Sequence, residues 1–285
     1  PSPVTPISQT SSSTVQHHGR RRMVAIAQLN ILPNDVSGNF DRAEKAIAEA
    51  SHRGASLVVL PETFTFGWRC PSKVDVSLVP EIPGPHSDRL CSLAKQHHII
   101  IVAGLTERRR DCLFDSAVLC DENGNLLLHY RQVNVETSIY TPGNVFDVSK
   151  SLAHTSLGDI AIVVCADTNS VIAQKVKDNH PALVAIPFAF GENPENFPLQ
   201  GDKALSWVAR NFAEAVDSVV IAANSVGPIE HPTIVSITKG ASAVCTPTGV
   251  QCIASDQMQD ICICDLDACT LYQHHPSHSS HVEPQ

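Results

Sequence analysis

The 285-residue sequence has no apolar run that approaches the length of a membrane span, which needs about 20 consecutive apolar residues. It has no excess of positive charge, because it contains 20 Lys and Arg residues but 29 Asp and Glu residues. The resulting formal net charge of −9 argues against a nucleic-acid-binding surface. Glycine-rich phosphate loops of the Walker or Rossmann spacing are missing as well. We therefore expect a globular protein with a small-molecule substrate, no nucleic-acid or membrane partner, and no cofactor.

The ten cysteines form no short secreted disulfide framework, since they are scattered singly or at strand spacing in a chain large enough for a full core. This distribution predicts reduced thiols and a cytoplasmic location. Cys262 and Cys264 alternate in DICICDLD and could bind a metal, but period-two apolar cysteines in a strand favour a core role. We expect no metal site.

Composition divides the chain into three parts. Residues 1–22 are rich in Pro, Ser and Thr, end in three arginines and contain no apolar segment of a secretory signal, so we expect a flexible tail. Residues 273–285 contain histidines that could hold a metal weakly, but their Ser/Pro/His composition also favours a flexible tail. Residues 23–272 are regular and are expected to form one large domain.

Within this domain, apolar strand patterns alternate with helical ones and are interrupted by hairpins, which predicts an α/β protein with a mixed sheet. A hairpin is expected to turn at Asn123 and Gly124. An amphipathic helix is expected from Asp202 to Val216, with Trp207 and Phe212 fitting its core face.

In the segment Ile160 to Asn169 (IAIVVCADTN), a β-branched apolar run leads to Cys165, and a short polar turn follows. Asp167, Thr168 and Asn169 can each cap the helix predicted to follow. Cys165 is thus expected at a strand-to-helix turn, where free backbone N–H groups favour a thiolate and later an oxyanion. Taken alone, such a residue is more often a buried structural cysteine.

Two further segments supply candidate partners for this thiol. ASLVVLPETF is a second buried strand pattern that ends at Glu62, a possible general base, although a carboxylate in this place is often merely solvated. NLLLHYRQVNVETSIYTPGN is a strand pattern that enters a long polar loop. It contains Gln132 and Glu136.

Taken together, the segments PETF, YRQVN and VCAD resemble, in their order, the motifs of the nitrilase superfamily of carbon-nitrogen hydrolases. The resemblance extends from MVAIAQLN at Met23 to the closing DICICDLD segment. It implies a four-layer α-β-β-α sandwich, which the pattern alone could not supply. It also implies a homo-oligomer assembled through the helices that flank the cysteine strand.

The resemblance assigns roles to five positions. Cys165 would be the nucleophile, Glu62 the general base, and the backbone N–H of Ala166 an oxyanion donor. Glu136 resembles the family's additional active-site glutamate, although it follows Gln132 more closely than in many members. Gln132 stands where the family carries a catalytic lysine, so this donor has no charge.

The substitution of Gln132 for lysine leaves three functions open. The first is a cysteine hydrolase that acts on a small amide or nitrile through a thioester. The second is a non-hydrolytic thiol-dependent reaction, such as acyl transfer or cyclisation, that uses Cys165 and Glu62. The third is a catalytically inactive protein that binds a small molecule or a partner.

Overall fold

The computed structural model describes residues 22–68, 75–144, 151–191, 204–230, 235–255 and 258–271. The two predicted tails therefore lie outside the described residues, apart from Arg22. This residue forms an ion pair with Asp267, with 2.8 Å between Nε and Oδ1. The domain described below begins at that point.

Two mixed six-stranded sheets form the centre of the fold. The first sheet contains, in spatial order, β14 (Asp260–Asp265), β1 (Met23–Gln28), β2 (Leu57–Val59), β3 (Ile100–Arg109), β4 (Cys112–Cys120) and β5 (Leu126–Arg131). The second contains β13 (Gly249–Ile253), β12 (Ala243–Thr246), β9 (Val219–Ala223), β8 (Leu183–Pro187), β7 (Gly158–Ile162) and β6 (Leu152–Thr155). In each sheet three neighbouring strands are parallel, β1–β2–β3 and β7–β8–β9, and the outer strands are antiparallel.

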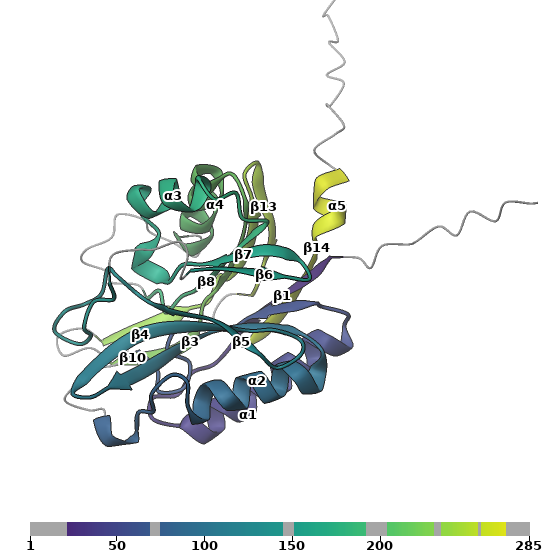
Figure 1. The fold of residues 1–285 in the computed structure, drawn as a ribbon. Helices are drawn as coiled ribbons and strands as arrows, with labels where there is room; N and C mark the ends of the chain where they lie inside the picture. Colours follow the sequence, from purple (N-terminus) through teal and green to yellow (C-terminus); the bar gives the residue numbers. More distant parts are fainter. Residues whose placement is uncertain are drawn as a thin grey trace, which may run out of the picture.

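Four helices cover the outer faces of these sheets: α1 (Val36–His52), α2 (Pro85–His97), α3 (Ser170–Lys177) and α4 (Ala204–Val216). The short α5 (Leu266–Leu271) follows directly after β14, and 3-10 turns occur at η2 (Val76–Leu78) and η4 (Cys165–Asp167). A separate two-stranded ribbon pairs β10 (Val226–Glu230) with β11 (Val235–Lys239). Figure 1 shows α1 and α2 on the outer side of the first sheet and α3 and α4 on the outer side of the second. The predicted α-β-β-α sandwich is confirmed.

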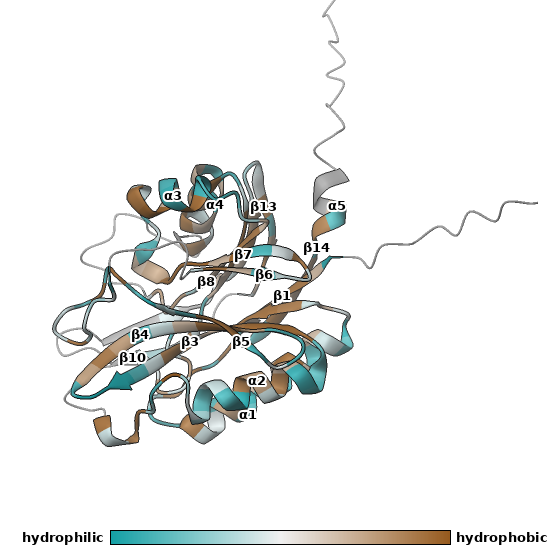
Figure 2. Cartoon of the chain, in the orientation of Figure 1, coloured by the Kyte–Doolittle hydropathy of each residue, from teal (hydrophilic) through white to brown (hydrophobic). Residues whose placement is uncertain are grey.

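The strand sequences explain this layering, because successive side chains of a strand point to opposite faces. In β1, Val24 and Ile26 pack in the core cluster that joins the two sheets, whereas Ala25 and Ala27 pack against α1 and α2. A strand that is buried on both faces needs an uninterrupted apolar sequence. Figure 2 accordingly shows β1 in the hydrophobic colour, while α1 and α2 have mixed colours.

Two expectations about individual side chains are wrong. Trp207 on α4 is 52% exposed, because it lies on the helix face opposite to the buried Leu205, Ala209 and Phe212. Cys264 is buried and Cys262 packs against the core, as expected, but the prediction of reduced thiols is wrong for Cys252 and Cys262, which form a disulfide across the adjacent edge strands β13 and β14 of the two sheets. This pairing depends on how the two sheets meet, which the local strand pattern does not contain.

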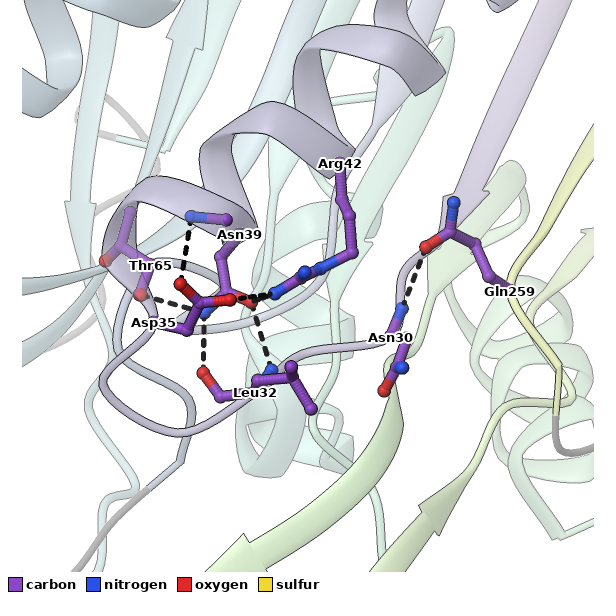
Figure 3. A network of polar contacts seen from close by, with 8 residues as sticks. Asn30, Leu32, Asp35, Asn39, Arg42, Thr65 and Gln259 are labelled. Carbon is purple, nitrogen blue, oxygen red and sulfur yellow. Dashed lines mark hydrogen bonds and ion pairs between the residues drawn. The ribbon is translucent and has the colours of Figure 1, made fainter.

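The beginning of α1 holds the loop that follows β2. The buried Asn39 side chain donates from Nδ2 to the carbonyl oxygens of Leu32 (2.8 Å) and Thr65 (3.0 Å), and Asp35 caps the helix by accepting from the N–H of Gly38 (Figure 3). The Asn34 N–H adds a bond to the Phe66 carbonyl at 3.1 Å. The loop containing residues 61–67 is thereby fixed by the residues that begin α1.

Within the described residues, no helix combines the length and the apolar character needed to cross a membrane.

Candidate active site

Cys165 lies where the second sheet passes into α3. After β7 ends at Ile162, Val163 still donates its N–H to Ala185 of β8, and Cys165 then opens the 3-10 turn η4 with φ of 37°. A positive φ is uncommon for a residue with a Cβ and marks local strain that the surrounding structure must hold. Thr168 supports the turn by donating its Oγ1–H and its N–H to the Cys165 carbonyl. The predicted strand-to-helix turn is confirmed.

Glu62 reaches the same place from the first sheet. It lies in the loop after β2 and is 2% exposed, and its N–H donates to the Phe188 carbonyl at 3.2 Å. Its carboxylate oxygen Oε2 accepts the N–H of Ala189, which follows β8 in the other sheet. Glu62 is therefore clamped between the two sheets through both its backbone and its side chain.

The close approach of β3 to this loop requires glycine at position 104. A Cβ on Gly104 would lie 2.4 Å from the Glu62 Cα and 2.8 Å from the Pro61 carbonyl oxygen. The backbone of Gly104 uses this proximity, since its N–H donates to Pro61 and its carbonyl accepts from Phe64. The glycine thus sets the position of the Glu62 backbone.

The Glu62 carboxyl and the Cys165 thiol are hydrogen-bonded to each other. Burial raises the pKa of Glu62, while hydrogen bonds from Asp115, Cys165 and Ala189 partly offset this effect. Burial, followed by the charge of Glu62, raises the pKa of the Cys165 thiol well above its ordinary value. Burial thus favours the neutral thiol, and a thiol that is hydrogen-bonded to a glutamate carboxyl has the arrangement of a nucleophile with its general base.

Gln132 lies next to this pair. It is 4% exposed, its N–H donates to the Asp115 carbonyl, and its Nε2 donates to the Val164 carbonyl at 3.2 Å, one residue before Cys165. The side-chain amide has a second N–H. The structure thus brings Cys165, Glu62 and Gln132 together.

Asp167 ties the Gln132 segment to the cysteine turn. Its buried carboxylate accepts the Tyr130 hydroxyl at 2.5 Å and the N–H groups of Val133 (3.0 Å) and Asn134 (2.8 Å). Of the three residues predicted as possible caps of the following helix, Asn169 is the cap, because it accepts from two N–H groups of the first turn of α3. The Asp167 carboxylate instead holds the end of β5 and the residues after it in a fixed position relative to η4.

The two remaining predicted residues are more exposed. Ala166 lies in the first turn of η4, directly after the nucleophile candidate, and is exposed. Glu136 is also exposed, in a turn where it accepts the Ser138 N–H at 3.2 Å through Oε1 and the N–H groups of Ile139 and Tyr140 through its carbonyl. Oxyanion binding by Ala166 and an active-site role for Glu136 remain predictions.

Sequence reasoning missed three residues that shape the site: Asp115, Ala189 and Asn224. Asp115 of β4 is fully buried and its carboxyl is hydrogen-bonded to Glu62. Asn224 bonds both backbone groups of Phe190 and thereby supports the segment that includes Ala189. A signal existed only for Asp115, as a carboxyl inside the otherwise apolar strand pattern LFDSAVLC.

Among the described residues, no group of three or more His, Cys, Asp or Glu side chains has a geometry that could hold a metal ion. The groups that the structure brings together at this site are a thiol, carboxyl groups, an amide and backbone N–H groups.

The raised pKa of Cys165 leads to a prediction about its reactivity. Alkylation follows the thiolate fraction, so the rate should still be rising with pH beyond the ordinary thiol pKa of 9.0, where the rate for an unperturbed cysteine levels off. Gln132→Lys would place an ammonium beside the thiol and shift this profile to lower pH. The measurement is the rate of iodoacetamide modification of Cys165 against pH, followed by peptide mass. Superimposable profiles for the two proteins would contradict the prediction.

The fold and site together define a layered α/β protein with a cysteine–glutamate pair between the ends of two sheets. The sequence pattern of one family, described as Carbon-nitrogen hydrolase, matches residues 23–274. The chain belongs to this family, part of the nitrilase superfamily, and its enzyme class is that of the carbon-nitrogen hydrolases.

Individual relatives agree with this assignment. The chain is 31% identical over 178 residues to a nitrilase from Pyrococcus abyssi, a match that spans 58% of this chain and 66% of that protein. It is 23% identical to the N-carbamoylputrescine amidase of Arabidopsis thaliana, over 89% of each chain. A crystal structure of an amidase from Nesterenkonia sp. has the same fold, with a TM-score of 0.72 at 23% identity, over 89% of this chain and 93% of that one.

Proposed function

We propose that this protein is a cysteine-dependent carbon-nitrogen hydrolase that acts on a small amide or nitrile through a thioester acyl-enzyme. The observation that carries the proposal is the hydrogen bond between the Glu62 carboxylate and the Cys165 thiol, at a strained strand-to-helix turn. A buried structural cysteine has no need of a buried carboxylate as its partner, because burying a carboxylate is costly.

The reaction on an amide then proceeds in balanced steps. Glu62 accepts the thiol proton as the Cys165 sulfur attacks the carbonyl carbon, and the Ala166 N–H and the Gln132 amide stabilise the oxyanion. Glu62 returns the proton to the departing nitrogen, the C–N bond breaks, and a thioester remains. Water then attacks the thioester, Glu62 takes its proton, and cleavage of the C–S bond restores the thiol and releases the acid.

Relatives support the choice of substrate class. The similar proteins include a nitrilase and an N-carbamoylputrescine amidase. A structure of a variant of the Nesterenkonia amidase, which shares the fold at 22% identity, carries the acetamide moiety of fluoroacetamide covalently on its active-site cysteine. Fluoroacetamide is therefore a suitable probe for the corresponding thiol here.

The neutral Gln132 keeps the second function in consideration. Among the described residues, the groups with the largest effects on the pKa values of Glu62 and Cys165 include no cation. A site with this little positive charge stabilises an oxyanion less than a lysine-bearing one, and acyl transfer or cyclisation through the same Cys165 and Glu62 is the alternative function.

The test is to incubate the wild-type protein with a panel of small amides, nitriles, carbamoyl amines and fluoroacetamide. Ammonia release and intact mass are followed, and any adduct is located by peptide mass. An adduct on Cys165 with ammonia release is expected for a hydrolase. An adduct that is released only to an added acyl acceptor would favour the alternative. A protein that forms no adduct and releases no ammonia with any compound of the panel would refute both reactions and favour a catalytically inactive binding protein.

Homo-oligomeric assembly is part of the same proposal. The predicted interface involves the helices beside the cysteine strand, and there Val171 of α3 and Trp207 of α4 are 65% and 52% exposed. Large apolar side chains exposed on neighbouring helices favour an interface. Assembly of identical subunits and a cytoplasmic location stay predictions.

A further inference from the structure

Asp115 has an unusual environment for an ionised carboxylate. It is fully buried, and neither of its carboxyl oxygens accepts a hydrogen bond from an N–H or O–H donor of the described chain. An ionised carboxylate without donors in such a place costs several kcal/mol, and proteins avoid this cost by protonating the group. The hydrogen bond that Asp115 does form joins it to the carboxyl of Glu62.

Two carboxyl groups can hydrogen-bond to each other only when a proton lies between them. The surroundings decide which group holds it. Glu62 accepts the Ala189 N–H and faces the Cys165 thiol, so two donors stabilise its charge. Asp115 has neither, and the residue opposite it on β3 is the uncharged Thr106.

We propose that Asp115 is a protonated carboxylic acid in the resting protein, that it donates its hydrogen bond to Glu62, and that it thereby positions this base and sets its basicity. The chain of donors runs from Asp115 to Glu62 and from Cys165 to Glu62. When Glu62 takes the thiol proton, the Asp115 proton stays in place, so the three groups hold two protons before and after the transfer. Asp115 acts through Glu62 and is a positioning residue.

The charges around Asp115 favour this state. Burial is the largest effect that raises the pKa of Asp115, and the charges of two acidic groups that face it, Glu62 from the loop after β2 and Asp167 from η4, raise it further. The Cys165 thiol of η4 also faces Asp115. Tyr130 of β5 faces the same layer but gives its hydroxyl hydrogen to Asp167. The nearby Arg131 bonds Glu107, together with Ser116, which points to the opposite face of β4.

The neutral Gln132 is consistent with the proposal. An ammonium at this position would stabilise an ionised Asp115, because both residues lie on the same face of adjacent strands and the Gln132 N–H already bonds the Asp115 carbonyl. With an amide there, the proton on Asp115 keeps the charge of the site close to that of a single carboxylate. The acid and the amide thus fit each other electrostatically.

The first test reads the proton directly and does not depend on the proposed hydrolase function. Infrared spectra at neutral pH should show the carbonyl band of a protonated carboxylic acid in the wild type and lose it in Asp115→Asn. Asp121→Asn is the matched control, because Asp121 is also buried but accepts hydrogen bonds from Asn123 and Asn125, which lower its pKa. The control should keep the band. A wild type without the band, or a band that persists in Asp115→Asn, overturns the proposal.

Thermal unfolding gives a second independent readout. Because the fold raises the pKa of Asp115 above its unfolded value of 3.8, the contribution of this group to stability is fully present below that pH and is lost as pH rises towards the folded-state pKa. Asp115→Asn has no such titration, so its Tm relative to the wild type should rise as the pH increases above about 4, by about 2 to 4 °C for each unit of pKa shift. A pH-independent difference would contradict the proposal.

The third readout is kcat/KM and its pH dependence, and it rests on the proposed function. It distinguishes a role of Asp115 in positioning Glu62 from a merely structural role. Asp115→Asn keeps an N–H donor for Glu62, so kcat/KM near neutral pH should be largely retained, and the alkaline decline caused by loss of the Asp115 proton should disappear. Asp115→Leu removes the donor and should lower kcat/KM roughly 10- to 100-fold. Equal losses in both variants, with an unchanged pH profile, would overturn the positioning role. Inactivity of every variant and of the wild type would refute the hydrolase function while leaving the infrared result to decide the protonation state.

Discussion

Glu62→Gln is expected to lower kcat/KM for the best amide substrate by about 10²- to 10⁴-fold, which is the range that general acid–base catalysis contributes. The amide oxygen of glutamine can still accept the Ala189 N–H, so the clamp between the two sheets is kept. What is lost is the group that receives the thiol proton, and the raised pKa of Cys165 means that the thiol does not ionise without it. Steady-state ammonia release measures the effect.

Two controls make this result specific. Glu49→Gln changes an exposed glutamate on α1, on the outer side of the first sheet, and should leave kcat/KM unchanged. Cys165→Ala should abolish both the acyl adduct and turnover, which sets the zero of the assay. Wild-type kcat/KM in a folded Glu62→Gln protein would show that Glu62 is not the base, whatever its contact with the thiol.

The part of the site that sequence predicts is the part encoded by strand ends. Glu62 and Cys165 each follow a buried apolar run, and polar residues directly after such runs lie at the edges of sheets. Their mutual contact is a different matter, because they come from different sheets and meet only when the two sheets pack. The family resemblance supplied that information, since no local pattern specifies which strand ends face each other.

The remaining site residues depend on contacts that leave no trace in a local pattern. Ala189 contributes its N–H to Glu62, and a backbone group can be supplied by almost any residue. Gly104 lies within an ordinary strand, but a Cβ on this residue would lie only 2.4 Å from the Cα of Glu62, so a larger residue would displace the Glu62 backbone. Asp167 looked like a helix cap by position but is held by three residues of the β5 segment. In each case tertiary packing decides between roles that are locally equivalent.

Gln132→Lys is expected to raise turnover of simple amides on the order of 10²-fold if the protein is a hydrolase limited by its neutral oxyanion donor. Removing one oxyanion donor costs about 2.7 to 4 kcal/mol of barrier, and restoring a charged donor should regain a comparable part of it. The new ammonium would lie beside Val164 and Asp115, near three carboxyl groups and the attacking sulfur. Its charge should therefore be stable at this buried position, and the gain should appear in kcat more than in KM.

The opposite result has an equally definite physical meaning. If the pocket is specialised for another thiol-dependent reaction, the native substrate should need Cys165 and Glu62 yet react more slowly with lysine at position 132, because an ammonium would ionise Asp115 and disturb a site built around a neutral amide. Gln132→Met separates charge from shape, since it keeps the length of the side chain and removes the N–H donor. A hydrolase should then rank Lys above Gln above Met on simple amides, measured as ammonia release under identical conditions. A rank order with Gln first would refute the limited-hydrolase prediction and favour a reaction to which the neutral amide itself is suited.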